Sequence, residues 1–204
     1  GMPNLGLTIN WDTNRKSGLK NMSFGFVVNR TATYNEDVYA SGTNSSTSFM
    51  GSMAYDATVN GYLGSELNAD NAYNYMPWKP VVGYQSGMIS TFGGYDDQFV
   101  GASEIIFDNG EVAVGGPLAQ SYGRRVTGSK YDYVFNVGAN ISDFIYLGAN
   151  LGVTSIEYDY NEYFMERAVD PADFEIILDN GDVLYFNDML YKYSYGATGN
   201  GFYG

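Results

Sequence analysis

Apolar and polar residues alternate most clearly over residues 131–153. In the first half of this stretch, apolar side chains occupy every second position from Tyr131 to Ile141. Successive side chains of a strand point to opposite faces, so this pattern predicts a strand with one apolar face. Ser142-Asp143 predicts a tight turn, after which the alternation resumes. We therefore expect a β-hairpin with both strands apolar on the same face.

The second face of this hairpin is unusual for a protein in water. A soluble strand usually presents Lys, Glu and Thr to solvent, whereas here the second face holds mostly Gly and Asn. Its residues are Asp132, Val134, Asn136, Gly138 and Asn140, then Tyr146, Gly148, Asn150 and Gly152. Phe144 and Tyr146 lie beside the turn, where an interfacial aromatic girdle would be expected. An apolar outer face and a small polar inner face are typical of an outer-membrane β-barrel hairpin.

The same alternation predicts further strands and an all-β, antiparallel fold. We expect five strands, near residues 4–11, 20–33, 120–140, 144–160 and 189–203. In the second strand, Met22, Phe24, Phe26 and Val28 share one face. The polar stretch 12–18 predicts a turn. We expect residues 1–204 to be a single fragment of a transmembrane β-barrel domain.

Two long stretches do not alternate, and we expect them to be loops. Residues 34–119 form a mixed helix and hairpin insertion on the extracellular side, and residues 160–188 form an acidic loop. A helix is expected over 47–59, with Ser45, Ser46 or Thr47 as its N-cap. A second helix is expected to begin at Pro77. Turn sequences at Asn109-Gly110 and Asp179-Asn180-Gly181 predict two accessory hairpins.

Charge and composition exclude several classes of function. The chain has no Cys and no His, which removes disulfides, thiolate metal sites, the commonest general base and the commonest transition-metal ligand. We expect no catalysis, no metal and no cofactor. The net charge of −13 makes a nucleic-acid partner unfavourable. Carboxylates crowd residues 157–188, but they lack the spacing of an EF-hand, so a solvated acidic loop is favoured over a Ca²⁺ site.

Several motifs together resemble one family. They are Asn4-Leu5-Gly6, Asn10-Trp11-Asp12, Ser17-Gly18-Leu19-Lys20-Asn21, Phe24-Gly25-Phe26-Val27-Val28-Asn29-Arg30-Thr31, Gly116-Pro117-Leu118-Ala119-Gln120-Ser121-Tyr122-Gly123-Arg124, Gly128-Ser129-Lys130-Tyr131-Asp132 and Tyr146-Leu147-Gly148-Ala149-Asn150-Leu151-Gly152. They resemble the Bacteroidetes branch of the FadL/TodX-type outer-membrane transporters, often labelled hemin receptor or outer membrane protein. The similarity covers nearly the whole chain.

The resemblance implies a fourteen-stranded barrel, plugged by an N-terminal hatch, that passes hydrophobic small molecules such as long-chain fatty acids or aromatic hydrocarbons. The chain resembles only the middle of such a protein, without the hatch or the last strands, so we expect an internal fragment. The implied location is the cell outer membrane. Expected partners are a hydrophobic ligand, outer-membrane lipid and lipopolysaccharide, and other copies through open sheet edges. The hemin label gains no support, because His and Cys are absent.

A set of apolar residues in the insertion is the candidate ligand-binding site. The set is Phe49, Met50, Met53, Trp78, Val81 and Met88. Met and aromatic side chains suit a surface that accepts many apolar shapes. The alternative is that these residues only pack the two loop helices on each other. Arg124 and Arg125 could likewise bind a carboxylate or lipopolysaccharide phosphate, or pair with acidic neighbours.

Loop lengths predict the orientation of the strands. Bacterial barrels keep periplasmic turns short and extracellular loops long. The turns at 12–18 and 142–143 should therefore lie on one side of the membrane, and 34–119 with 160–188 on the other. Two rival functions stay open: a surface-exposed binding or adhesion protein anchored by a β-barrel, and a soluble periplasmic β-domain.

Overall fold

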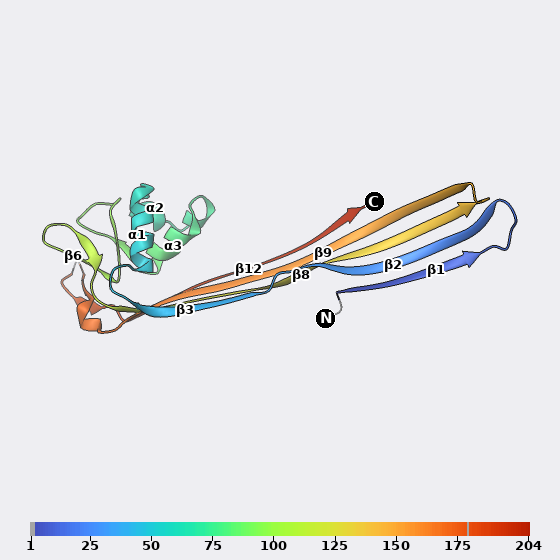
Figure 1. Ribbon diagram of the computed structural model, residues 1–204. Coiled ribbons are helices and arrows are strands. Elements are labelled where there is room, and N and C mark those ends of the chain that lie inside the picture. Colours follow the sequence, from blue (N-terminus) through green and yellow to red (C-terminus); the bar gives the residue numbers. More distant parts are fainter. Residues whose placement is uncertain (1–2, 179) are drawn as a thin grey trace. The chain divides into compact units, whose positions relative to one another are not determined.

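The computed structural model of the protein describes residues 3–178 and 180–204 (Figure 1). The chain divides into two compact units, which are described separately. Unit 1 comprises Gly1–Val38, Arg124–Glu162 and Tyr193–Gly204, and unit 2 comprises Tyr39–Gly123 and Tyr163–Lys192.

The main element is a six-stranded sheet with the order β1-β2-β8-β9-β12, in which β3 also pairs with β8. Its strands are β1 (Asn4–Asp12), β2 (Leu19–Thr33), β3 (Glu36–Asn44), β8 (Leu118–Ile141), β9 (Ile145–Ala168) and β12 (Asp188–Tyr203). The β1–β2 and β2–β8 pairs are antiparallel. The expected antiparallel β architecture is confirmed.

The strand register places the apolar residues of neighbouring strands directly opposite one another. Phe26 of β2 lies opposite Leu7 of β1 and opposite Phe135 of β8. One step along, Phe24 lies opposite Ile9 and Val137. A slip of one residue would send every side chain of a strand to the other face. The register therefore confirms that the alternating apolar positions share one face of the sheet.

The turn between β8 and β9 forms where Ser142-Asp143 predicted it. Both residues have φ of 58°, and the amide of Phe144 donates to the carbonyl of Ile141 at 3.1 Å. Asn140 stabilises this turn, because its side-chain oxygen accepts from the Asp143 amide at 3.0 Å and its amide group donates to Asp143 Oδ1 at 2.8 Å. Asn and Asp tolerate such conformations better than most residues. In the other turn, Gly18 takes a φ of 79°.

Two expected loop boundaries are wrong. The insertion expected over 34–119 contains β3, which belongs to the main sheet. Its apolar residues, Val38, Tyr39 and Ala40, follow one another directly and its other residues are polar or Gly, so it carries no alternation to detect. The acidic loop expected over 160–188 is shorter, because β9 continues to Ala168 and β12 begins at Asp188. Strand pairing with neighbours holds the acidic residues of 157–166 in β9.

Unit 2 contains the helices and the small hairpins. The helices are α1 (Phe49–Val59), α2 (Gly64–Leu67), η1 (Ala72–Asn74), α3 (Trp78–Gln85) and η2 (Pro171–Asp173). The hairpins pair β4 (Ile89–Thr91) with β5 (Phe99–Gly101), β6 (Glu104–Ile106) with β7 (Val112–Val114) and β10 (Glu175–Ile177) with β11 (Val183–Tyr185). None of the helices in the described part of the chain could cross a membrane.

Most expectations for unit 2 are confirmed, with two corrections. Helices occur at 49–59 and from 78, and both accessory hairpins form; Asp179, expected in the turn of the second, lies outside the described residues. The N-cap of α1 is Ser48, whose hydroxyl accepts from the amides of Met50 and Gly51, and not Ser45, Ser46 or Thr47. Helix α3 ends at Gln85, so Met88 lies beyond it.

Unit 2 has a packed hydrophobic core. Its buried members are Met53, Ala54, Ala57, Leu67, Ala72, Val81, Ile89 and Phe99. Helices α1 and α3 and strand β4 supply most of them, and Phe49, Tyr62, Met76, Tyr84 and Met88 pack around this cluster.

Candidate functional site

One face of the sheet in unit 1 carries a continuous apolar surface, which we call the apolar belt. Its members are Leu5, Leu7, Ile9 and Trp11 of β1, Met22, Phe24, Phe26 and Val28 of β2, Phe135, Val137, Ala139 and Ile141 of β8, and Leu147, Ala149, Leu151 and Val153 of β9. Large members are strongly exposed: Leu7 is 63% exposed, Phe135 50% and Leu151 54%. An apolar surface of this extent marks an interaction with lipid or with another protein.

No charged residue lies within the strand segments that form the apolar belt. Residues 4–11, 22–28, 133–141 and 145–153 contain no Asp, Glu, Lys or Arg on either face. The charge-free segment of β8, residues 133–141, covers eight residue steps, which correspond to about 26 Å of strand or about 20 Å of height at a tilt near 40°. With the aromatic residues at its two ends, this height approaches the apolar band of a membrane barrel, which is about 25 Å tall.

Charged and aromatic residues lie at both ends of the apolar belt. At the turn end, Lys20 forms an ion pair with Asp143, and Phe144 is 87% exposed. At the far end, the guanidinium of Arg30 lies 5.9 Å from the centre of the Tyr131 ring. Aromatic and basic side chains at the two limits of an apolar surface are typical of the two membrane interfaces.

The opposite face of unit 1 is packed with small and polar groups. A β-carbon at Gly25 would lie 3.3 Å from the side-chain nitrogen of Asn136, so the glycine makes room for the amide. The Thr154 hydroxyl donates to Asp132 at 2.6 Å. The ring of Tyr203 covers Gly152. This face offers hydrogen-bonding groups that suit contact with water.

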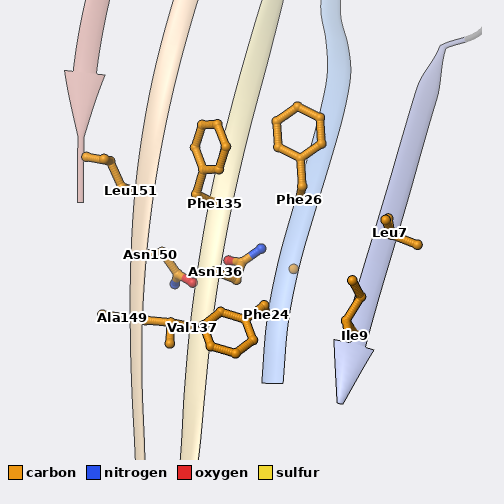
Figure 2. Close-up of a pocket in the computed structure, with 11 residues that line it drawn as sticks. Leu7, Ile9, Phe24, Phe26, Phe135, Asn136, Val137, Ala149, Asn150 and Leu151 are labelled. Atoms are coloured by element: carbon orange, nitrogen blue, oxygen red, sulfur yellow. The ribbon is translucent and has the colours of Figure 1, made fainter. Parts of the chain in front are cut away.

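A shallow hollow lies in the middle of the apolar belt (Figure 2). Phe24 and Val137 form one row across the strands, and Phe26 and Phe135 form the next, with ring centres 4.9 Å apart. The remaining wall comes from Leu7 and Ile9 of β1 and from Ala149 and Leu151 of β9. The hollow has a volume of about 440 Å³. We call it the belt hollow.

The ligand-binding residues expected from the sequence all lie in unit 2, and the structure separates them by burial. Met50, Met53 and Val81 are almost fully buried. Phe49 stacks on Phe164, with ring centres 4.8 Å apart, and the ammonium of Lys79 lies 5.1 Å from the Phe49 ring. Trp78, in contrast, is 43% exposed. Helix packing thus accounts for most of the set, and its role in ligand binding stays a prediction.

Two members of the expected set, Met50 and Met88, line a groove of about 460 Å³ in unit 2. Met189 of β12 adds a third methionine. Other apolar walls come from Val82, Ala102, Phe186 and Leu190, while Asp188 and Lys192 supply charges. We call this the methionine groove. Flexible thioether side chains can adapt to ligands of different shape.

A buried polar cluster holds the start of α1, and sequence reasoning missed it. Glu166 of β9 is fully buried. Its carboxylate accepts from the Ser48 hydroxyl at 2.7 Å, the Phe49 amide at 2.7 Å and the Gln120 side chain at 2.6 Å. A carboxylate at the N-terminus of a helix is favoured by the free amides there. No local sequence signal distinguishes Glu166 from the other acids of its segment.

A second carboxylate, Glu104, packs against the same turn of α1. Burial raises the pKa of Glu104 above the ordinary 4.5, and the nearby Glu166 raises it further, while a hydrogen bond from the Gly101 amide opposes the shift. Glu104 also lies against Gly51, where no side chain would fit. The arrangement positions the start of the helix.

Arg124 and Arg125 differ in their surroundings. Arg124 forms an ion pair with Glu36 at the start of β3, as the acidic-neighbour interpretation predicted. Arg125 is exposed. The residues of the described chain form no cluster of Asp and Glu suited to hold a metal ion.

Comparisons with protein-family models, with curated proteins and with solved structures found no match to this chain.

Proposed function

We propose that unit 1 is part of the wall of an outer-membrane β-barrel and that the protein transports hydrophobic small molecules across the outer membrane, as a member of the FadL/TodX-type family. The observation that carries this proposal is the apolar belt. Four strand segments without charge place their large apolar side chains on one exposed face. In water this surface would be strongly unfavourable, at about 25 cal/mol for each Å² of apolar area. In a bilayer the same surface is matched by lipid.

The connections between strands are consistent with this location. The β1–β2 and β8–β9 connections are short, whereas residues 45–117 and 169–187 form long connections at the other strand ends. Barrels of the bacterial outer membrane have short periplasmic turns and long extracellular loops. We therefore assign the short turns to the periplasm.

The transport part of the proposal is supported by the methionine groove. Its volume of about 460 Å³ lies in the range of small-molecule sites, and its lining combines apolar side chains with polar groups. Met50 and Met88, expected to bind ligand from the sequence, contribute to it. The groove would capture an apolar molecule before its passage across the membrane.

The two tryptophans of the chain allow a direct test of membrane contact. Trp11 belongs to the apolar belt, and Trp78 starts α3 in unit 2. The Trp78→Phe variant, reconstituted into vesicles of brominated phosphatidylcholine, should show Trp11 emission that is strongly quenched. The matched Trp11→Phe variant should leave Trp78 unquenched. Equal quenching of both residues, or no quenching of Trp11, would contradict the proposed membrane face.

Ligand capture is tested by titrating the full chain with oleate and with naphthalene. Met88→Lys replaces an apolar wall of the methionine groove with a charged side chain, and the cost of desolvating this charge against an apolar ligand should weaken affinity by at least about tenfold. Val59→Lys is the control, because Val59 is 64% exposed and lies outside the groove. Unchanged affinity in Met88→Lys would remove the groove from the proposal.

One observation favours a second function, a surface-exposed binding or adhesion protein. Tyr73, Tyr75 and Trp78 follow one another closely and are 49%, 58% and 43% exposed. Exposed Tyr and Trp side chains commonly form recognition surfaces. Two results together would make adhesion the better assignment. Cells that express the Tyr75→Ser variant would adhere less than cells that express the wild type, and uptake of oleate and naphthalene would be the same with and without the protein.

A further inference from the structure

We infer that the belt hollow is a binding site for one lipid molecule that carries a phosphate, with an acyl chain in the hollow and the phosphate on Arg30. The inference rests on the proposed membrane location of unit 1. It goes beyond that location, because a wall that only faces the bilayer needs no particular lipid.

The hollow has the shape and chemistry of an acyl-chain site. Its walls are the aliphatic and aromatic side chains of the strands β1, β2, β8 and β9, and its floor is the backbone near Gly25. Because Ala149 has only a methyl group, the belt surface is lower there than along its aromatic neighbours. An alkyl chain lying in this depression would contact side chains on several strands at once, which increases dispersion contacts.

Arg30 supplies a cation at the distance that a lipid phosphate requires. It follows Phe26 by four residues on β2, which corresponds to about 13 Å along the strand and about 10 Å of height at a tilt near 40°. Half of an apolar band about 25 Å tall is about 12 Å. A chain anchored by a headgroup at Arg30 would therefore reach the hollow near the middle of the bilayer.

The guanidinium of Arg30 is available for an anion. Arg30 shares the face of the apolar belt, since it lies opposite Tyr131. It contacts the Tyr131 ring, and over the residues that the structure describes it is paired with no carboxylate. An arginine at the membrane interface binds phosphate oxygens with two parallel hydrogen bonds. Charge and position together favour a phosphate-bearing lipid over a neutral one.

The test is lipid retention by the full chain in detergent, measured by native mass spectrometry. The probes are dimyristoyl phosphatidic acid and dimyristoylglycerol, which have the same chains and differ in the phosphate. We expect wild-type protein to bind the first about tenfold more tightly. Arg30→Gln should abolish this difference without weakening dimyristoylglycerol. Arg125→Gln is the matched control, because Arg125 is exposed outside the belt.

A second variant tests the hollow itself. Ala149→Phe fills it while making the belt more apolar, and we expect both lipids to bind at least about tenfold more weakly. Ala139→Phe adds the same bulk to the belt on β8 outside the hollow and should leave binding unchanged. Leu7→Trp replaces Ala149→Phe if that variant fails to fold, since Leu7 also lines the hollow.

The outcomes separate this inference from the proposed function. In the Trp78→Phe background, quenching of Trp11 by brominated lipid should persist in Arg30→Gln and Ala149→Phe. Normal Trp11 quenching in that background, together with unchanged lipid affinity of Ala149→Phe and Leu7→Trp, overturns the lipid site alone. Equal affinity of wild type and Arg30→Gln for phosphatidic acid overturns the phosphate contact. Binding of inorganic phosphate by a protein that does not bind phosphatidic acid overturns it as well. Absence of Trp11 quenching in the Trp78→Phe variant overturns the membrane location.

Discussion

In unit 1 the apolar side chains of neighbouring strands are exposed, whereas in unit 2 side chains of the same types are buried. Leu7 and Leu151 of the apolar belt are 63% and 54% exposed, while Leu67 and Leu118 of unit 2 are fully buried. Among the described residues, every buried hydrophobic residue belongs to unit 2 except Val126. The proposed membrane location of unit 1 accounts for this difference, because a sheet in lipid needs no second layer, while a unit in water does.

The largest expected effect contrasts a leucine of each unit. Leu67→Ala should destabilise unit 2 by about 2–5 kcal/mol, because it removes a buried side chain and leaves a cavity. Leu7→Ala should cost less than about 1 kcal/mol, because the side chain is mostly exposed. Denaturant unfolding is followed by Trp78 emission for unit 2 and Trp11 emission for unit 1. Similar losses in both variants would contradict the contrast.

A charge in the belt gives the next largest effect. Leu151→Lys in lipid vesicles should destabilise the protein by about 2–4 kcal/mol, the cost of a lysine near the bilayer midplane of a barrel. Val59→Lys, at a site of similar exposure in unit 2, should stay within about 0.5 kcal/mol. Urea unfolding from vesicles measures both changes. If the two variants behave alike, the belt faces water.

Removing the N-cap of α1 should have a moderate effect confined to unit 2. Ser48→Ala deletes the hydroxyl that accepts from Met50 and Gly51 and donates to Glu166. We expect a loss of about 1 kcal/mol, with up to about 2 kcal/mol because Glu166 is buried. Ser46→Ala is the control, since Ser46 does not cap the helix. Thermal unfolding followed by Trp78 emission reports the change, and equal effects of the two substitutions would exclude the cap.

The smallest effect is a dependence on pH at Glu104. Burial raises the pKa of this carboxyl, so the folded state binds the proton more tightly than the unfolded state does. The associated stability is present below the ordinary value of 4.5 and is lost as pH rises through the folded pKa. Glu104→Gln should therefore be more stable than wild type at pH 7, and this gain should vanish below pH 4.5. Exposed Glu66→Gln should show no such crossover.

The sheet was predictable where residues alternate with a period of two. The strands near 4–11, 20–33 and 120–140 and the turn at Ser142-Asp143 follow from side-chain alternation and turn chemistry. Strand β3 was missed because Glu36–Asn44 carries polar residues on both faces, so that its pairing with β8 alone defines it. Alternation also does not reveal where a polar strand ends, which is why β9 exceeds its expected limit.

The candidate sites were less predictable than the strands. The belt hollow depends on register, since its lining residues on β1, β2, β8 and β9 come together only after these strands have paired. Four consecutive residues before α1, from Ser45 to Ser48, are of types that can cap a helix. Glu166, 118 positions away, selects Ser48 by accepting its hydroxyl. Because the residue that determines the N-cap position is so distant along the chain, a short window of sequence does not reveal that position.

The order of the main sheet restricts the number of strands that could close it into a cylinder. Along β1-β2-β8-β9-β12 the strands alternate in direction, so the outer strands β1 and β12 run the same way (Figure 1). A second copy placed beside the first by rotation about an axis along the strands would set β12 against β1 in parallel. Any closed cylinder with antiparallel neighbours throughout must therefore insert an odd number of strands between these two edges.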